Sequence, residues 1–202
     1  MVDQGNVPRI ISADTRRPDR VPPGQKVIER FPVLTHGTTP QIDLKRWTFR
    51  IFGLVEKEVV LTYEEFMSLP KVEVYADFHC VTTWSRLGNL WAGVSWGTLL
   101  SLVTPLDTAK YVMIHCEHDY TTNVPMTDMN REDVLFADTH DGSQLTPDHG
   151  WPLRAVVPAL YAWKSAKWAR GVEFMETDRP GYWEMNGYHM HGDPWKEERY
   201  SR

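Results

Sequence analysis

Apolar and polar residues alternate with a period of two in several short stretches of the chain, which are rich in Val, Ile and aromatic residues. Such stretches predict β-strands, because successive side chains of a strand point to opposite faces. They lie at 47–55, 71–80, 110–117, 154–160 and 171–177. Gly53 is expected at a turn or bulge in the first stretch. Cys80 is the last residue of the second, so we expect its side chain at a strand end.

Two other stretches have a helical pattern. In 61–70, Thr62 is a candidate N-cap, Glu65 follows at the spacing of a capping box, and Pro70 ends the run. In 93–103, Ser95 is a candidate cap before an apolar helical face. Many short strands with a few short helices favour an α+β fold with a mixed sheet over a doubly wound fold.

Length and composition indicate one globular domain. The chain has 202 residues, of which 42% are hydrophobic and 24% charged, and it contains nine tryptophans. Residues 1–30 are rich in Arg, Pro and Asp and have no hydrophobic period, so we expect an extended N-terminal arm before a domain at 31–202. The tryptophans fit either an aromatic core or the walls of a deep cofactor pocket.

Charge and cysteine content exclude several classes of protein. A net charge of −5 argues against non-specific nucleic-acid binding, and no apolar run reaches the ~20 residues of a membrane span. The N-terminus lacks the apolar core of a signal peptide. Two cysteines, Cys80 and Cys116, do not make a disulfide framework. We therefore expect a cytoplasmic protein with reduced thiols.

Cys80, taken alone, fits a small core residue, a nucleophile or a soft metal ligand. A structural zinc site is not expected, because no second cysteine stands at the required spacing. The run "HCEHDY" at 115–120 gives no four-ligand face on a strand, and His189 and His191 supply two ligands at most. We interpret these two histidines as surface residues.

A second candidate region is "HGWPLRAVVPALYAWKSAKWARGVEF" at 149–174. It contains His149, Arg154, Ser165 and Lys167 among apolar and aromatic residues. Guanidinium, ammonium and hydroxyl groups beside a core indicate a buried anion such as a phosphate. The alternative is a solvated run of charges.

Together these segments bring a family resemblance into view. Cys80 with the following "VTTWSRLGNLWAGVSWGTLL", the segment at 149–171, "FPVLTHGTTP" at 31–40, "YTTNVP" at 120–125 and the terminal "GYWEMNGYHMHGDPWKEERYS" occur in this order. The chain resembles the molybdopterin-binding domain of the sulfite oxidase family, and most closely its stand-alone bacterial oxidoreductases. The resemblance runs from about residue 20 to the C-terminus and implies a mixed-sheet fold that binds molybdenum–molybdopterin.

The resemblance also implies roles for individual residues. Cys80 stands where the family's cysteine gives its thiolate to molybdenum. Residues implied to hold the pterin and its phosphate are Thr35, His36, Cys116, His149, Arg154, Ser165, Ala166 and Lys167. Cys116 is a binding candidate and not a second metal ligand. Arg86 is a candidate anion-binding residue at the pocket mouth, grouped with Cys80 as catalytic.

The sequence departs from animal-type sulfite oxidases at two places where these have arginine, here Leu34 and Ser85. We therefore expect two-electron oxygen-atom transfer on a small substrate, with reduction of an S-oxide or N-oxide favoured over sulfite oxidation, and an unidentified electron donor or acceptor. Two alternatives stay open: a binding module without metal, and a thiol-based redox enzyme using Cys80 and Cys116.

Overall fold

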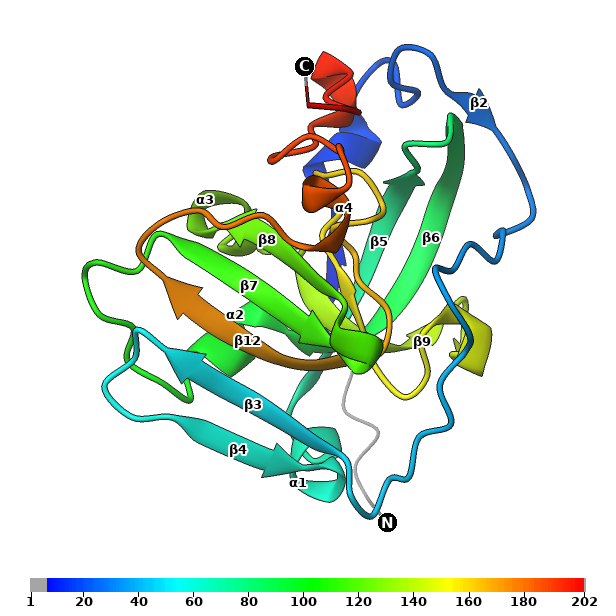
Figure 1. Ribbon diagram of the computed structural model, residues 1–202. Helices are drawn as coiled ribbons and strands as arrows, with labels where there is room; N and C mark the ends of the chain where they lie inside the picture. The colour runs from blue at the N-terminus through cyan, green and yellow to red at the C-terminus, as the bar shows by residue number, and fades with distance from the viewer. Residues whose placement is uncertain (1–6, 202) are drawn as a thin grey trace.

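The computed structural model describes residues 7–201, and these form two β-sheets that pack face to face (Figure 1). The first six residues of the predicted arm lie outside the described residues. One sheet has the order β1-β5-β6-β9-β10, with β11 paired to β9 and β2 paired to β6. Its strands are β1 (Arg9–Ile11), β2 (Lys26–Val27), β5 (Lys71–His79), β6 (Trp84–Ser95), β9 (Leu135–His140), β10 (Ser143–Gln144) and β11 (Arg154–Val156).

The other sheet has the order β4-β3-β12-β7-β8. Its strands are β3 (Thr48–Gly53), β4 (Val59–Thr62), β7 (Tyr111–Cys116), β8 (Thr121–Pro125) and β12 (Ala169–Met175). The pairing of β3 with β12 is parallel and the other pairings in this sheet are antiparallel. The mixed sheets and the few short helices confirm the predicted α+β class.

Helices are short and lie at the ends of strands. They are α1 (Tyr63–Met67), α2 (Trp96–Leu100), α3 (Met126–Met129) and α4 (Tyr182–Met185), with 3-10 turns at Ala13–Arg16, Glu117–Asp119, Pro147–His149 and Pro194–Lys196. The capping box is confirmed: the Thr62 side chain accepts from the Glu65 amide, and the Glu65 carboxylate accepts from the Thr62 amide. Ser95 likewise caps α2 by accepting from the Thr98 amide.

The main core lies between the two sheets. Phe49 and Ile51 of β3, Val112 of β7, and Val94 and Phe136 of the opposite sheet are at most 1% exposed. Burial of such side chains contributes about 1.5–3 kcal/mol each, which makes this layer the principal source of stability. The two sheets therefore form a rigid support for the loops at their edges.

The predicted strands all form, although their ends shift by a few residues and the strand at 154–160 shrinks to β11. Gly53 ends β3 with a φ of +89°, and a Cβ there would come within 2.4 Å of the Phe174 carbonyl oxygen. Strands β1, β2, β4, β8, β9 and β10 and the twelve-residue β6 were not predicted. In β6 the pattern fails because the polar residues Ser85 and Asn89 are fully buried.

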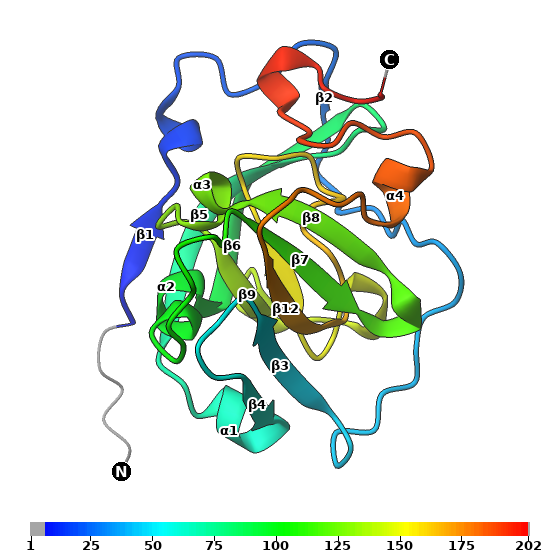
Figure 2. The same cartoon turned by 60° about the vertical axis from the view of Figure 1, so that its left-hand side comes forward.

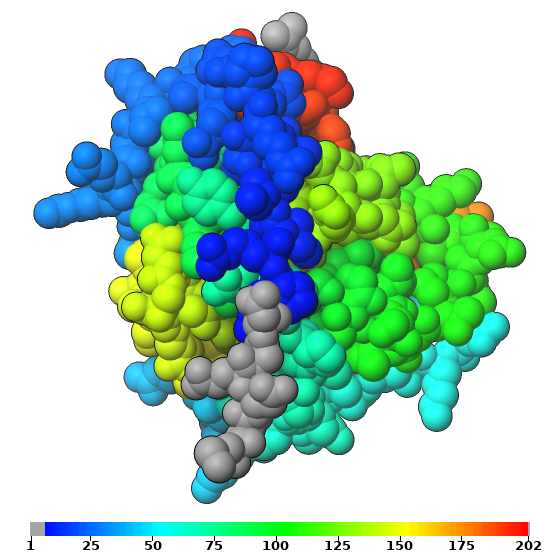
Figure 3. All heavy atoms as spheres, turned by 180° about the vertical axis from the view of Figure 1, so that it is seen from behind, coloured from blue at the N-terminus to red at the C-terminus, as the bar shows by residue number. Residues whose placement is uncertain are grey.

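The described part of the N-terminal arm lies along the first sheet. β1 pairs in parallel with β5, and β2 pairs in parallel with β6. Figure 3 shows this segment (blue) lying across the back of the molecule. Arg20 anchors it through an ion pair of 2.5 Å with the buried Asp77. These contacts attach the described part of this segment to the sheet whose strand β5 leads to Cys80.

Candidate functional site: a cavity between the sheets and the terminal segments

A cavity of about 430 Å³ opens beside the ends of β5 and β7. Its walls come from five separate parts of the chain, which Figures 1 and 2 show converging near α4. The lining residues are Phe31, Pro32, Leu34, Thr35, His36, Phe78, Cys80, Val81, Thr82, Trp84, Glu117, His118, Tyr120, Asp148, His149, Arg154, Ala162, Trp163, Ser165, Ala166, Lys167, Trp168, Tyr182, Trp183 and Tyr188. Aromatic residues supply a large share of this wall.

Cys80 lies directly after β5, in the loop that leads into β6. The loop is closed by two backbone hydrogen bonds, from the Cys80 amide to Trp84 O (2.8 Å) and from the Thr83 amide to Cys80 O (3.0 Å). The thiol contacts the Thr82 hydroxyl at 3.2 Å. Burial raises the pKa of the Cys80 thiol, and the Thr82 hydrogen bonds and the charge of Arg199 act in the opposite direction. A thiol at a cavity wall is available to a soft metal.

Arg154, at the start of β11, is a buried cation in the same cavity. Its guanidinium donates to backbone carbonyls, to Ser165 O at 2.7 Å and His149 O at 3.1 Å. No carboxylate of residues 7–201 forms an ion pair with it. Burial lowers the pKa of Arg154 to about 10. A buried charge without a counter-ion indicates a site for an anion.

Lys167 and His149 are also at this end of the cavity. The Lys167 ammonium donates to the Thr35 hydroxyl (2.5 Å) and to Asp148 O (2.8 Å). Burial, and then the nearby charge of Arg154, lower the pKa of Lys167 to about 8. An anion between Arg154 and Lys167 would relieve both effects, because it stabilises both cations.

Aromatic rings surround Arg154, and one of them, Phe31, stacks on His149. His149 lies against Phe31 with 4.7 Å between ring centroids, and its Nε2 contacts Phe31 O at 3.3 Å. The Arg154 guanidinium faces Phe31, Phe78 and Trp91 at 5.2–5.7 Å from the ring centroids. These aromatic faces favour a cation and keep the guanidinium in place without an acidic partner.

The remaining predicted cavity residues have distinct surroundings. The Ser165 hydroxyl accepts from the Val157 amide (2.8 Å), and the Ala166 carbonyl accepts from the Ala155 amide (2.9 Å), so both fix the loop against β11. His36 also lines the cavity, and its Nε2 shares a hydrogen bond of 2.7 Å with the Tyr182 hydroxyl. Thus the structure brings together Thr35, His36, Cys80, His149, Arg154, Ser165, Ala166 and Lys167 in one cavity.

The structure places Cys116 and Arg86 elsewhere. Cys116 belongs to the core between the sheets, and burial raises the pKa of its thiol strongly. Arg86 forms an ion pair of 2.5 Å with Asp141 and also contacts Asn89, so these two residues fix the position of its guanidinium. Neither residue is part of the cavity wall. The two thiols are free, without a bond between them.

Several cavity residues were not predicted, above all Tyr120, Trp163, Tyr182, Trp183 and Tyr188. Trp163 packs with Cys80 in a small cluster, and its indole N–H donates to the buried Glu184 (2.7 Å). These residues come from loops and from α4, where no periodic pattern marks them. The available signal was composition, since aromatic residues are dense in the last third of the chain.

The minor candidate clusters yield no metal site. Within residues 7–201, no group of three or more His, Cys, Asp or Glu side chains is arranged to hold a metal ion. His115 instead pairs with Glu173 at 2.9 Å. His189 and His191 are half-buried, and His191 contacts Asp128 and Glu198.

No helix in the described part of the chain has the length and apolar character needed to cross a membrane.

These features define a cofactor-binding domain whose cavity wall contains a thiol, a buried guanidinium and a partly buried ammonium group. Residues 36–183 match the family described as "Oxidoreductase molybdopterin binding domain". The chain belongs to this family. It is an oxidoreductase, and its cofactor is molybdenum–molybdopterin.

Individual relatives agree with this assignment. The chain is 46% identical over 191 residues to "Uncharacterized oxidoreductase YuiH" of Bacillus subtilis, a match that covers 93% of this chain and 96% of YuiH. It is 30% identical over 152 residues to "Putative protein-methionine-sulfoxide reductase subunit YedZ1" of Azospira oryzae, covering 75% of this chain and 58% of the relative.

A solved structure supports the fold. The sulfane dehydrogenase SoxCD from Paracoccus pantotrophus superposes with a TM-score of 0.64 at 22% identity, over 70% of this chain and 41% of that chain. At this identity the likeness concerns the fold. The chain spans about two fifths of the SoxCD chain and well over half of YedZ1.

Proposed function

We propose that the protein catalyses two-electron oxygen-atom transfer on a small, neutral substrate, with reduction of an S-oxide or N-oxide as the physiological direction. The observation that carries this proposal is the division of the cavity. Its cations, Arg154 and Lys167, donate to oxygens of Ser165, His149, Thr35 and Asp148, whereas Cys80 packs with Val81, Tyr161 and Trp163.

The residues present fit the cofactor. Arg154 and Lys167 would hold the phosphate, because the buried Arg154 has no ion-pair partner among the described residues and the partly buried Lys167 donates to neutral groups. His149 and His36 would orient the pterin, and Cys80 would give its thiolate to the metal. A cavity of about 430 Å³ lies within the range of pockets that enclose a small cofactor.

The cavity offers little to a small dianion. Leu34 lines it with its side chain half exposed, whereas Ser85 is buried and bonded to the His79 ring at 2.8 Å. Among the described residues, Arg154 is the one arginine in the wall, and the phosphate would engage it. Each missing charge-assisted hydrogen bond costs about 1.5–3 kcal/mol, so sulfite would bind weakly beside Cys80.

When bound, the molybdenum cofactor would supply a centre that accepts an oxygen atom and cycles by two electrons. The balanced reaction is R₂SO + 2e⁻ + 2H⁺ → R₂S + H₂O, with the electrons delivered by a reduced partner that this chain does not supply. The aromatic wall excludes water around the substrate. The His36–Tyr182 pair holds a proton between two titratable groups at the mouth of the cavity. The relative YedZ1, whose name refers to methionine sulfoxide, supports the S-oxide direction.

The test uses the purified protein with its molybdenum and pterin content measured. Reduced viologen with dimethyl or methyl aryl sulfoxides and trimethylamine N-oxide assays reduction, and sulfite with ferricyanide assays oxidation. We expect turnover in the first assay and at least a hundredfold lower kcat/KM for sulfite, in line with two lost charge-assisted contacts. Efficient sulfite turnover without S-oxide or N-oxide reduction would refute the proposal.

The location of the protein in the cytoplasm stays a prediction.

A further inference from the structure

Two backbone carbonyls of the loop that carries Cys80 accept hydrogen bonds from side chains outside the family match at 36–183. Gln25 of the arm donates to Cys80 O at 3.0 Å. Arg199, close to the C-terminus, donates through Nη1 to Val81 O at 2.7 Å and through Nη2 to Pro23 O at 3.2 Å. The terminal segments therefore both contact the backbone of this loop.

The loop needs such external support. Thr83 has a φ of +72°, a left-handed conformation that is costly for a β-branched residue and persists only where its surroundings fix it. Within residues 7–201, Arg199 forms no ion pair, and its guanidinium lies over the Tyr161 ring at 5.1 Å from the centroid. Its hydrogen-bonding capacity is thus directed to the two carbonyls.

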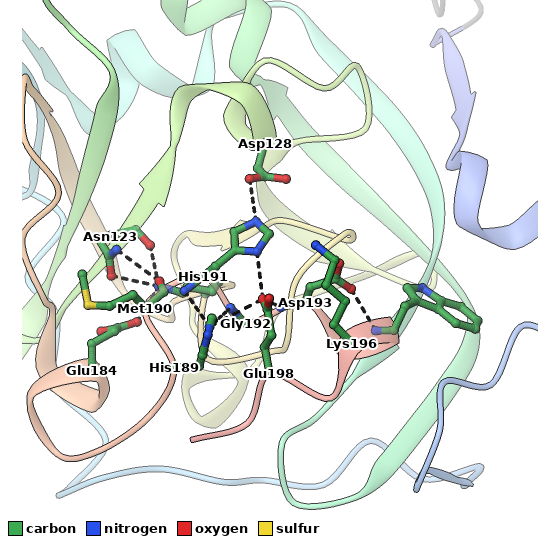
Figure 4. Close-up of polar contacts among 12 residues, drawn as sticks. Asn123, Asp128, Glu184, His189, Met190, His191, Gly192, Asp193, Lys196 and Glu198 are labelled. Atoms are coloured by element: carbon green, nitrogen blue, oxygen red, sulfur yellow. Dashed lines mark hydrogen bonds and ion pairs between the residues drawn. The ribbon is translucent and has the colours of Figure 1, made fainter. Parts of the chain in front are cut away.

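Residues 188–201 carry Arg199 and form a segment that we call the C-terminal clasp. His191 fastens it: Nδ1 contacts Glu198 of the clasp at 2.9 Å, and Nε2 contacts Asp128 of α3 at 3.0 Å (Figure 4). Carboxylates only accept, so both ring nitrogens must carry a proton to satisfy this geometry. Protonated His191 thus bridges α3 and the residue next to Arg199.

The groups around this bridge support it. The His189 ring nitrogen Nδ1 accepts from the amides of His191 and Gly192 at 3.1 and 3.2 Å, and the Asp193 amide donates to Glu198 at 2.9 Å. Lys196 pairs with Asp193 at 3.3 Å, and the Glu198 carboxylate pairs with His191.

A buried ion pair fixes the start of the clasp. Lys164, which is fully buried, donates to Met190 O at 2.7 Å, and its ammonium lies 2.6 Å from the Glu184 carboxylate. Figure 4 shows Glu184, Asn123 and Met190 on one side of His191, and Glu198 and Asp193 on the other. The clasp is therefore held at Met190, at His191 and, through Arg199, at the Cys80 loop.

We propose that Arg199 is a positioning residue for the metal ligand Cys80, and that the Asp128–His191–Glu198 bridge keeps Arg199 in place. The clasp acts on the backbone of the loop and touches neither substrate nor metal. The inference rests on the proposed function in one respect, the role of Cys80 as ligand.

The experiment compares Arg199→Met and Arg199→Lys with Arg50→Met, a control that removes an exposed arginine paired with Glu58 on the other sheet. Amide hydrogen exchange at residues 80–84 is measured in the full chain, with and without bound cofactor. Losing the anchoring hydrogen bond should raise exchange of the Cys80 and Thr83 amides about tenfold in Arg199→Met. We expect a smaller increase in Arg199→Lys and none in the control.

A second pair of variants tests the fastening. His191→Gln keeps one donor and should loosen the loop less than His191→Ala, and a melting curve shows that each variant is folded. In the molybdenum-loaded protein, Arg199→Met should also change the Mo(V) electron paramagnetic resonance spectrum, whereas Arg50→Met should not.

The outcomes separate the two proposals. Unchanged exchange at 80–84 and an unchanged spectrum in folded, metal-containing Arg199→Met would overturn the positioning role alone. Loosening in Arg199→Met but in neither His191 variant would overturn the fastening role of the bridge. Absence of bound molybdenum from the wild-type protein would overturn the proposed function, and the role of Cys80 as ligand with it.

Discussion

Replacing Arg154 by Met should weaken cofactor binding strongly while changing the free energy of unfolding of the cofactor-free protein only a little. The guanidinium is fully enclosed, and its pKa is lowered to about 10 because burial disfavours the charge. A shift of this size corresponds to a cost of about 3 kcal/mol for keeping the cation in the cofactor-free protein. Methionine removes that cost and fills much of the same volume.

The substitution also removes hydrogen bonds. The carbonyls of His149 and Ser165 lose their donor, which costs about 1–3 kcal/mol for each buried acceptor. The gain of about 3 kcal/mol and the loss of about 2–6 kcal/mol partly cancel, so the free energy of unfolding of the cofactor-free protein should change by no more than about 3 kcal/mol. A phosphate, in contrast, loses two charge-assisted contacts, and its binding should weaken by about 10²–10⁴-fold.

The assay measures molybdenum and pterin per protein chain after purification, together with a denaturant titration of the cofactor-free form. Arg131→Met is the matched control, because Arg131 is a partly buried arginine paired with Asp133, away from the cavity. Full cofactor content in Arg154→Met would refute the phosphate assignment. A stability loss well beyond 5 kcal/mol, on the usual scale of mutational effects, would make Arg154 a structural residue instead.

Three further outcomes are expected. Cys80→Ser should keep the pterin but lose nearly all turnover, because a hard oxygen ligand does not replace a thiolate; assays normalised to pterin content check this, and full turnover would exclude Cys80 as the ligand. The pKa of His191 is raised above 6.5 by its hydrogen bonds to Asp128 and Glu198, so its stabilisation is complete below that pH and is lost as pH rises through the folded pKa. The difference in Tm between wild type and His191→Gln should therefore shrink on going to alkaline pH, and a constant difference would contradict a charged bridge. Thr62→Ala should lower the free energy of unfolding by about 1 kcal/mol and leave activity unchanged. Thr62→Ser keeps the cap and should leave the free energy of unfolding unchanged in the same denaturant titration.

Features set by short-range patterns could be predicted from the sequence. The capping box at Thr62 and Glu65 depends on residues three apart, and the position of Cys80 follows from the alternation along one strand. The segment at 149–171 was predicted to hold a buried anion because the cations Arg154 and Lys167 stand among apolar and aromatic residues. These predictions required no knowledge of which segments meet in space.

Features set by long-range contacts could not be predicted in the same way. Arg86 has the charge of an anion-binding residue, but a partner 55 positions away, Asp141, determines where its guanidinium points. Cys116 is adjacent in sequence to the cavity residue Glu117, yet β7 turns its thiol into the core. The contact between Arg199 and Val81 joins residues 118 positions apart, in a segment without any periodic pattern.

The dispersed origin of the cavity wall has a consequence for biosynthesis. Its residues extend from Phe31 to Tyr188, and Trp163 depends for its orientation on Glu184. A growing chain on the ribosome thus has no complete pocket until Tyr188 has been synthesised. The complete cavity becomes available to the cofactor only after the segment at 182–188 has folded against the sheets.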